Sequence, residues 1–389
     1  MRILVAPDSY KLTLDAATAA GVIAAAARAV FPQAEIDECP VADGGEGTLA
    51  AWARARNATV TRVPACDVFG TPLDCPVATD PVTAEVLVEA AHTCGLPLPE
   101  MRDPGRSLST GLGLTLKAVL AGNPEARVRI ALGGTGTVDG GLGAAMALGM
   151  VLSGPVGTVN PVGTVQPVGL PDLPKGLRVS FDNPFLVPPV FLCDTQSPLL
   201  GSTGAVPVFG PQKGVAPERF LQYEAALEHL MAAASMAAGR PFTDGPGLGA
   251  AGGLGALFSI LCGAPCVSGS RYMLTVLEFV RRMANVDLVV TGEGCLDDTS
   301  FNGKIVGEIA TLCMAAHRPL LVLPGRSRLT AEGQVGHGAF STGPMVVRAT
   351  VSPRQADPDK RMVNALLYDT AHSAFLDFSK KQLFPGGGF

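Results

Sequence analysis

The segment LGGTGTVDGGLG, residues 132–143, is the densest cluster of residues that could bind an anion. It follows an apolar run typical of a strand and precedes AAMALGM, which is typical of a helix. A glycine-rich connection of this kind presents backbone N–H groups, and the positive end of the helix dipole adds to their attraction for phosphate or carboxylate. Thr135 and Thr137 contribute hydroxyl donors. The segment therefore predicts an anion site, although glycines also serve tight strand–helix packing.

Two further turns combine glycine with carboxylates. The first is DGGEGT, which begins at Asp43 and contains Glu46. The second is TGEG, residues 291–294, followed closely by Asp297 and Asp298. Mg²⁺ is usually held by one or two carboxylates together with substrate phosphates, so carboxylates beside phosphate-binding loops suit this ion. Each carboxylate also has an alternative role as a turn former or helix cap.

Polar residues follow several apolar runs directly. DSYK, residues 8–11, follows the first run, and Lys11 could meet a carboxylate or a phosphoryl group. Asp194 follows VFLC and is a candidate general base, because a hydroxyl nucleophile needs a positioned proton acceptor. FGPQKG places Lys213 among turn residues. A solvated lysine and a capped strand end are the ordinary alternatives.

Other catalytic motifs are missing from the sequence or incomplete. There is no GxxxxGK[ST] loop and no GxSxG elbow. GLGAAG, residues 247–252, fits GxGxxG, but no evident strand precedes it and no acidic residue follows at the offset of a dinucleotide-binding fold. A dinucleotide-dependent oxidoreductase built on this segment is the alternative from another enzyme class.

The composition indicates a globular chain without a polyanionic partner. The chain has 389 residues, 47% of them hydrophobic and 16% charged, and a formal net charge of −5. It can bury a sizeable core, and nothing in it forms a polybasic face for nucleic acid. Nine cysteines without a CxxC, together with five histidines, argue against zinc and against a disulfide framework. A reducing cytoplasm fits this cysteine usage.

No segment is expected to cross a membrane. The apolar run before Pro7 is too short for the core of a signal peptide. Residues 140–171 carry no charge and are long enough to span a bilayer, but repeated glycines and prolines would break a helix there. We expect a buried loop and helix followed by a Pro/Gly-rich hairpin at residues 155–169.

Short apolar runs alternate with helix-forming segments, which favours an α/β fold with parallel strands. The alanine-rich segment 15–31 is expected to form a helix. Ligands of open parallel sheets bind beyond the carboxyl ends of the strands, so the polar residues after these runs indicate a site there. The runs expected as strands are residues 2–6, 36–39, 85–91, 128–132, 190–193, 287–291 and 319–323.

Six motifs, read together and in order, resemble those of the glycerate kinase family, in the class typified by bacterial enzymes of glyoxylate and sugar-acid pathways. They cover nearly the whole chain, so the resemblance is specific. The motifs are APDSYKLTLDA (6–16), PVADGGEGT (40–48), LGGTGTVDGGLGAAMALG (132–149), LCDTQSPLLGSTGAVPVFGPQKG (192–214), PGLGAAGGLG (246–255) and VDLVVTGEGCLDDTSFNGK (286–304).

The resemblance implies a two-domain α/β architecture. A flavodoxin-like doubly wound parallel-sheet domain would comprise residues 1–80 and 286–389, and a second α/β domain, residues 81–285, would be inserted and carry the glycine-rich loop. It also implies that the γ-phosphoryl group of ATP passes, with Mg²⁺, to a hydroxyl of D-glycerate, usually the 2-hydroxyl, in a cleft. The protein would be a cytoplasmic monomer or homodimer that acts on a small molecule, with no nucleic acid and no membrane as partner.

The resemblance indicates that the motifs matter but does not fix the role of each residue, so we assign the roles as a hypothesis. Lys11, Asp43 and Asp194 are the predicted catalytic residues, with Asp194 as acceptor of the hydroxyl proton. Which carboxylate is the base and which a metal ligand stays open, as does the choice between the 2- and 3-hydroxyl. The predicted substrate residues are Asp8, Ser9 and Glu46; the predicted metal ligands are Glu293 and Asp297; and the predicted nucleotide residues are Gly133, Gly134, Thr135, Gly136, Thr137, Asp139 and Gly292.

The chain departs from the family pattern at several motif positions. Losing an arginine after TGEG removes a fixed charge and a fork of donors. A paralogue acting on a related hydroxy acid, and a catalytically weakened protein that binds a small acid or nucleotide, therefore stay open beside a glycerate kinase. The departures are Val138 for Asn, Gln196 and Ser197 for two Asn, Cys295 for Arg, and Thr299 and Asn302 for Gln and His.

Overall fold

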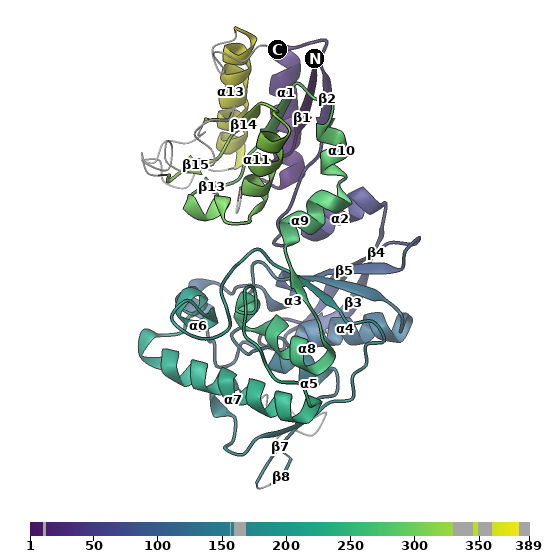
Figure 1. The fold of residues 1–389 in the computed structure, drawn as a ribbon, viewed down its shortest axis with the longest axis vertical. Coiled ribbons are helices and arrows are strands. Elements are labelled where there is room, and N and C mark those ends of the chain that lie inside the picture. Colours follow the sequence, from purple (N-terminus) through teal and green to yellow (C-terminus); the bar gives the residue numbers. More distant parts are fainter. Residues whose placement is uncertain (11–12, 156, 159–168, 330–344, 349–359, 381–389) are drawn as a thin grey trace. The chain divides into compact units, whose positions relative to one another are not determined.

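The computed structural model describes residues 1–10, 13–155, 157–158, 169–329, 345–348 and 360–380 (Figure 1). The chain divides into two units. Unit 1 comprises Met1–Asp43 and Ser270–Phe389, and unit 2 comprises Gly44–Gly269. Each unit has its own sheet and its own buried core.

Within the described residues, the main sheet of unit 1 has five parallel strands in the order β2-β1-β12-β14-β16. Numbered along unit 1 alone, this order is 2-1-3-4-5, the order of flavodoxin-like doubly wound folds. The expected fold class is thereby confirmed. The strands are β1 (Arg2–Val5), β2 (Glu35–Glu38), β12 (Leu288–Thr291), β14 (Leu320–Val322) and β16 (Met345–Val347).

Helices on both faces of this sheet explain why its central strands are apolar at consecutive positions. Ile3 and Val5 pack in one core with α1 and α13, whereas Leu4, which is also fully buried, points to the other face. α1 begins after Asp15, whose carboxylate accepts the N–H of Thr18 over 2.8 Å. The other elements of unit 1 are α1 (Ala16–Val30), α9 (Gly269–Val276), α10 (Phe279–Met283), β13 (Cys295–Leu296), η6 (Asp298–Phe301), α11 (Ile305–Ala315), β15 (Arg326–Ser327) and α13 (Lys360–Ser379).

The described part of unit 2 has a six-stranded mixed sheet in the order β3-β4-β5-β6-β10-β11. The pairs from β5 to β11 are parallel, whereas β3-β4 and β4-β5 are antiparallel. The strands are β3 (Thr59–Cys66), β4 (Pro72–Thr79), β5 (Glu85–Glu89), β6 (Arg127–Ala131), β10 (Val190–Leu192) and β11 (Cys266–Val267). A smaller antiparallel sheet contains β7 (Val151–Gly154), β8 (Gly157–Thr158) and β9 (Arg178–Ser180).

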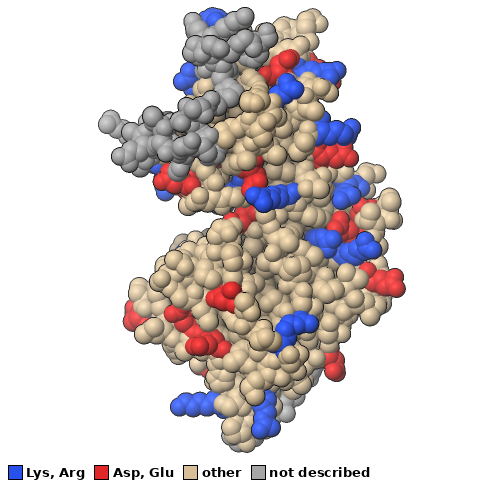
Figure 2. Space-filling model, viewed as in Figure 1, with Lys and Arg blue, Asp and Glu red and all other residues tan. Residues whose placement is uncertain are grey.

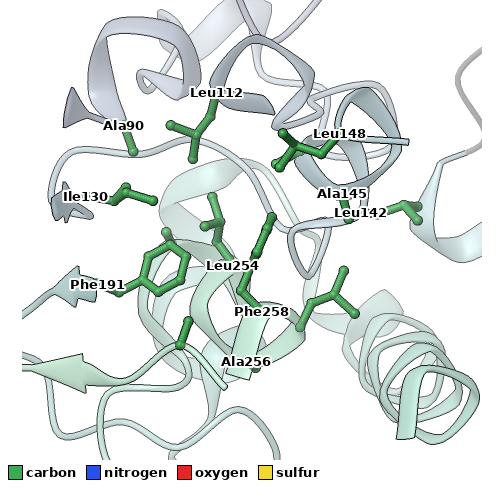
Figure 3. Packing of buried hydrophobic residues seen from close by; sticks show 14 of the residues in the cluster. Ala90, Leu112, Ile130, Leu142, Ala145, Leu148, Phe191, Leu254, Ala256 and Phe258 are labelled. Atoms are coloured by element: carbon green, nitrogen blue, oxygen red, sulfur yellow. The ribbon is translucent and has the colours of Figure 1, made fainter. Parts of the chain in front are cut away.

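The helices of unit 2 pack around a core that Figure 3 shows from close by. Ile130 of β6 and Phe191 of β10 meet Leu254 and Phe258 of α8 there, and Leu112 of α4 closes the cluster. The longer helices are α2 (Thr48–Arg56), α4 (Thr110–Gly122), α7 (Phe220–Ala238) and α8 (Leu254–Cys262). The shorter ones are α3 (Ala91–Cys94), η1 (Pro99–Met101), α5 (Leu142–Ala147), η2 (Leu170–Asp172), α6 (Ala205–Phe209), η3 (Pro211–Lys213), η4 (Pro217–Arg219) and η5 (Ala250–Gly252).

The unit boundaries differ from the expected domain boundaries. The hairpin of β3 and β4 belongs to unit 2, because β4 pairs with β5 through Ala78 and Leu87, whereas we expected residues 1–80 in the first domain. At the other boundary, α9 and α10 belong largely to unit 1 although the inserted domain was expected to run to residue 285. Arg282 of α10 donates to Asp37 beside the sheet of unit 1 over 2.7 Å.

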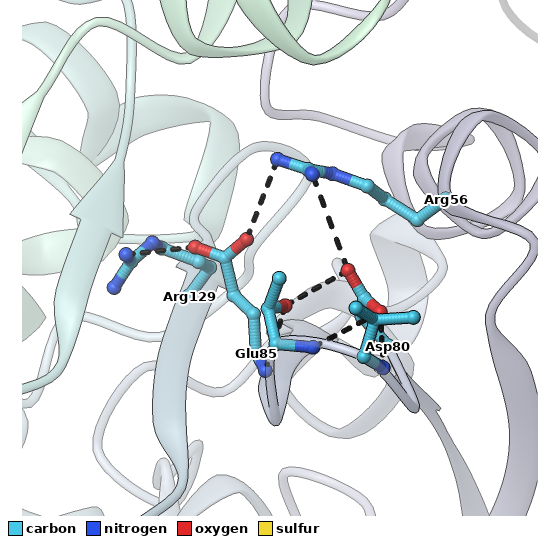
Figure 4. A network of polar contacts seen from close by, with 6 residues as sticks. Arg56, Asp80, Glu85 and Arg129 are labelled. Atoms are coloured by element: carbon cyan, nitrogen blue, oxygen red, sulfur yellow. Dashed lines mark hydrogen bonds and ion pairs between the residues drawn. The ribbon is translucent and has the colours of Figure 1, made fainter.

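A buried polar network fixes α2 to the sheet of unit 2 (Figure 4). Arg129 of β6 contacts one oxygen of Glu85 over 2.7 Å, and Arg56 of α2 lies between Glu85 and Asp80 at 3.8 and 4.0 Å. Asp80 also accepts the N–H of Val82 in the β4–β5 turn. Because both carboxylates are buried, their partners compensate the cost of removing them from water.

The uncharged stretch 140–171 forms α5, β7 and β8 as far as residue 158, and residues 159–168 of the expected hairpin lie outside the described residues. Among the helices of the described residues, none has both the length and the apolar content to cross a membrane. On the face drawn in Figure 2, most atoms belong to uncharged residues, and basic and acidic side chains are interspersed.

Candidate active site

In unit 1, the motifs that follow β1 and β12 run side by side at the carboxyl edge of the sheet. The N–H of Asp8 donates to the carbonyl oxygen of Gly292 over 2.8 Å, and the N–H of Leu323 after β14 donates to Thr291 over 2.8 Å. Asp8 is buried, and one of its oxygens accepts the N–H of Ser9. The sheet therefore brings three motif ends together where open α/β folds bind ligands.

Tyr10 lies at the same edge of the sheet. It is buried, and its hydroxyl donates to the carbonyl oxygen of Leu323. Burial, followed by the charges of Glu293 and Asp8, raises the pKa of Tyr10, so its hydroxyl stays a neutral donor. Gly292 permits this packing, because a Cβ there would lie 2.4 Å from the Tyr10 hydroxyl.

Glu293 is partly buried, and one oxygen of its carboxylate is buried without a partner among the described residues. Its Oε1 accepts no hydrogen bond from the described residues. Burial raises the pKa of Glu293, and the charges of Asp43 and Asp297 add to this, although Ser300 and Lys304 oppose it. The structure thus brings three carboxylates of unit 1 close enough to interact.

Asp297 is held by the short helix that follows it. Its carboxylate accepts the N–H of Thr299 over 2.9 Å and the hydroxyl of Thr299 over 2.6 Å, and Ser300 completes a capping box. Burial alone would raise the pKa of Asp297, but the bonds from Thr299 and the charge of Lys304 hold it below its ordinary value. Thr299, one of the departures, also accepts the ammonium of Lys304 over 2.7 Å.

These carboxylates fit a hard divalent cation. An unpaired buried oxygen on Glu293 beside Asp43 and Asp297 leaves negative charge that a cation would compensate. Within the described residues, no three His, Cys, Asp or Glu side chains converge as a complete metal cage. Mg²⁺ does not need one, since it keeps several waters and takes the rest of its ligands from phosphate.

In unit 2, the turn that follows Asp43 packs against the start of the glycine-rich loop. The N–H of Gly133 donates to the carbonyl oxygen of Gly44 over 3.0 Å, and a Cβ on Gly133 would lie 2.4 Å from the Cα of Gly45. The N–H of Leu132 donates to Leu192 over 3.0 Å, which places the ends of β6 and β10 side by side. The second and third motifs therefore meet as backbone against backbone, which only glycine allows.

Asp139 holds the glycine-rich loop from inside. Its carboxylate is buried and accepts the N–H and hydroxyl of Ser109 over 2.8 and 2.7 Å, the N–H of Gly143 over 3.0 Å and the N–H of Gly141 over 3.1 Å. It therefore joins the loop to α4 and α5. Asp139, a predicted nucleotide residue, thus stabilises the conformation of the loop.

Several loop N–H groups are also used within unit 2. Besides Gly133 and Gly141, Gly136 donates to Cys94 over 2.7 Å and Gly140 donates to Gly252 over 2.9 Å. The predicted binding of phosphate by this loop therefore depends on its other N–H groups.

Lys213 lies in a turn whose sequence alone predicts no role for it. It lies at the end of η3 with 3% of its surface exposed, and its ammonium donates to the carbonyl oxygen of Thr137 over 2.9 Å. Burial lowers the pKa of Lys213 to about 8, although Asp139 and Cys94 oppose the shift. The signal in the sequence was a single cation in a turn of Gly and Pro, FGPQKG.

Comparisons with known proteins identify the family of the chain. The sequence model of the glycerate kinase family matches residues 3–372. The chain belongs to the glycerate kinase family. The resemblance expected from the six motifs is therefore confirmed.

Individual members of the family are similar over most of their length. The chain is 34% identical over 330 residues to glycerate 2-kinase of Escherichia coli K12, which covers 84% of this chain and 85% of that one. It is 32% identical over 354 residues to glycerate kinase of Haemophilus influenzae, covering 89% and 91%. A crystal structure from Salmonella typhimurium LT2, provisionally assigned as glycerate kinase 2, superposes with a TM-score of 0.76 at 26% identity and covers 98% of this chain and 99% of that one.

Asp194, the predicted base of this glycerate kinase family member, lies in unit 2 directly after β10. Its Oδ1 accepts the hydroxyl of Ser268 over 2.8 Å, and the side chain is partly exposed. Cys193 precedes Asp194 directly, and a hydrogen bond from the Cys193 thiol lowers the pKa of Cys266 in the neighbouring strand β11.

The remaining predicted residues fall in both units. Lys11 lies outside the described residues. Ser9 is partly exposed in unit 1, and Glu46 is exposed in unit 2. The predicted residues of unit 1 are Asp8, Ser9, Asp43, Gly292, Glu293 and Asp297, and those of unit 2 are Glu46, Gly133, Gly134, Thr135, Gly136, Thr137, Asp139 and Asp194.

Proposed function

We propose that this chain is a kinase that transfers the γ-phosphoryl group of ATP to the 2-hydroxyl of D-glycerate, giving 2-phosphoglycerate and ADP. Membership of the glycerate kinase family and the relative named glycerate 2-kinase support the reaction. The observation of this structure that carries it is the unpaired buried oxygen of Glu293 beside two further carboxylates, because phosphoryl transfer needs a divalent cation near the phosphates.

In this mechanism each residue positions a group or compensates a charge. Glu293 and Asp297, with Asp43 nearby, would hold Mg²⁺, which neutralises charge on the transferred phosphoryl group when bound. The remaining N–H groups of the glycine-rich loop bind phosphate oxygens, while Asp139 keeps the loop in shape. Positioning and charge stabilisation account for most of the catalysis in such reactions.

Asp194 accepts the proton of the attacking hydroxyl. The hydroxyl of Ser268 donates to Oδ1 of Asp194 and so helps to orient this carboxylate for proton transfer. Tyr10 is kept neutral by its burial, and its hydroxyl donates to the carbonyl oxygen of Leu323, which packs against Gly292. This contact supports the backbone that carries Glu293.

The test is ADP release from MgATP by the purified protein, with and without D-glycerate, followed by addition of enolase. D-Glycerate-dependent ADP release with immediate formation of phosphoenolpyruvate would support the 2-kinase. ADP release without phosphoenolpyruvate would move the acceptor to the 3-hydroxyl.

A related small hydroxy acid is the second candidate substrate, because Cys295 stands in β13 where the family has an arginine. A screen of hydroxy acids for ADP release tests it. Faster turnover with another acid than with D-glycerate would favour that acid.

A further inference from the structure

Lys213 places an ammonium group inside unit 2, directly at the glycine-rich loop. η3 carries it there from the turn after α6, 76 positions away in sequence from its partner Thr137. An ammonium buried to this extent costs free energy unless other groups compensate it. Its position therefore indicates that other groups at the loop, or a bound anion, compensate its charge.

The described residues compensate this charge only in part. Lys213 has three N–H donors, and the described contacts give it one acceptor, the carbonyl oxygen of Thr137 at 2.9 Å. In the described part of the chain it forms no ion pair. Asp139 is the nearby carboxylate that acts on it, but the N–H and hydroxyl donors of Ser109, Gly141 and Gly143 already occupy that carboxylate.

The contact with Thr137 orients a peptide of the loop. In a trans peptide the carbonyl and the following N–H point in opposite directions, so holding the Thr137 carbonyl toward Lys213 turns the Val138 N–H the other way. Gly252 lies against the same carbonyl, and a Cβ there would lie 2.3 Å from the Thr137 oxygen. The lack of a side chain at Gly252 thus leaves room for this arrangement.

The loop itself contains no cation. In a P-loop the motif GxxxxGK[ST] carries its own lysine, whereas residues 132–143 of this chain contain none. We propose that Lys213 is the positioning residue that supplies positive charge to the glycine-rich loop and fixes it for the polyphosphate of the nucleotide. This inference rests on the proposed function, and it names a cation for the phosphate-binding loop of unit 2.

The experiment compares ATP binding and turnover in Lys213→Met, Lys213→Arg and the wild type. Methionine keeps most of the length of the side chain but removes the charge and the donors. Arginine keeps both the charge and the donors. Lys117→Met is the matched control, because Lys117 is exposed on α4 of the same unit. Calorimetry measures the Kd for ATP and for inorganic triphosphate with Mg²⁺, and steady-state assays measure KM for ATP and for D-glycerate separately.

We expect Lys213→Met to raise the Kd and KM for ATP by roughly tenfold or more, the effect of losing a charged hydrogen-bond donor. KM for D-glycerate should change little, and Lys213→Arg should recover part of the affinity. A purely structural lysine would lower the thermal stability and the number of active molecules without this selective effect on ATP. A folded Lys213→Met protein that binds ATP and triphosphate like the wild type would overturn the proposal.

A second measurement covers the case in which Lys213→Met does not fold. The Kd of the wild type for ATP is followed from pH 7.5 to 9, where Lys213 loses its proton and Asp139 and Cys94 are the other titratable groups that act on it. Affinity should fall over this range in the wild type and stay level in Lys213→Arg; a level wild-type profile would contradict the proposal. Wild-type protein that binds ATP but shows no D-glycerate-dependent turnover would refute the proposed function alone, and wild-type protein that binds no ATP would refute both.

Discussion

The N–H of Gly133 donates to the carbonyl oxygen of Gly44 over 3.0 Å, and this bond joins two motifs that lie far apart in the sequence. The approach is so close that a Cβ on Gly133 would lie 2.4 Å from the Cα of Gly45. The glycine-rich loop therefore positions the turn that contains Glu46. We therefore expect the candidate site to depend on the close spacing of these two backbone segments.

Gly133→Ala should therefore separate the turn from the loop. The added methyl group would force backbone apart, which costs about 1–3 kcal/mol in a packed interior. We expect lower stability in urea unfolding and a higher KM for ATP. Gly122→Ala at the end of α4 is the control, since a Cβ there meets nothing within 4 Å, and it should leave KM unchanged. Equal KM values for ATP in both variants would show that the contact does not matter to the site.

The sequence predicted the elements whose own residues determine them. Segment 15–31 was expected as a helix, and α1 spans Ala16–Val30 because Asp15 caps a run of good helix formers. β3 was not expected, because most of its residues are exposed and its place depends on pairing with β4. The two units divide at Asp43 and Gly44, whereas we expected a boundary near residue 80.

The site was predictable as a set of motifs but not as a set of contacts. The sequence indicates that the loop containing Asp139 matters, yet the donors to its carboxylate come from Ser109 as well as from the loop. Lys213 went without a role because its partner Thr137 lies 76 positions away. Contacts of this kind arise from tertiary packing, which no local pattern encodes.

Glu293→Gln should lower the kinase activity and raise the stability of the folded protein. At neutral pH the folded protein bears the cost of a buried carboxylate whose pKa is raised by its burial and by Asp43 and Asp297. A carboxyl group whose pKa is raised in the folded state lowers stability as the pH rises from its ordinary pKa to the raised one, and above both the full cost is present. Removing the charge should therefore raise Tm at pH 7.5. A gain of about 1 kcal/mol would shift Tm by roughly 2–4 °C.

The same variant should lose its response to Mg²⁺. Binding to the folded state raises Tm in proportion to the logarithm of ligand concentration, so millimolar Mg²⁺ should stabilise the wild type and not Glu293→Gln. Glu35→Gln is the control, because Glu35 is exposed in β2 and pairs only with Arg2 among the described residues. If Glu293→Gln responds to Mg²⁺ like the wild type, Glu293 is not a ligand of the ion.

Asp194→Asn should lower kcat by about 10²–10⁴ and leave KM for ATP nearly unchanged, because an amide cannot accept the hydroxyl proton. Ser268→Ala should lower kcat less, since it removes the 2.8 Å bond that orients the carboxylate but leaves the carboxylate itself in place. Asp182→Asn, an exposed aspartate of the same unit, should behave like the wild type. An Asp194→Asn enzyme with a normal kcat would mean that another carboxylate accepts the proton.

Lys213 should also leave a signature in the pH dependence of stability. Its pKa is about 8 in the folded protein and 10.5 in an unfolded chain, because burial disfavours the ammonium. Below pH 8 both states hold the proton and the folded state bears the full cost. Between pH 8 and 10.5 the unfolded state binds more protons, so this cost is relieved as the pH rises.

The free energy of unfolding of the wild type, relative to Lys213→Met, should therefore increase by about 3 kcal/mol at most from pH 8 to pH 10.5. Urea unfolding of both proteins at pH 7.5, 8.5 and 9.5 measures the difference, and the subtraction removes the titration of other groups that the variants share. Lys117→Met should follow the wild type at every pH, since its side chain is exposed. A difference that stays constant with pH would mean that Lys213 keeps its proton in the folded protein, and thus that unit 2 compensates its charge more fully than the single bond to Thr137 indicates.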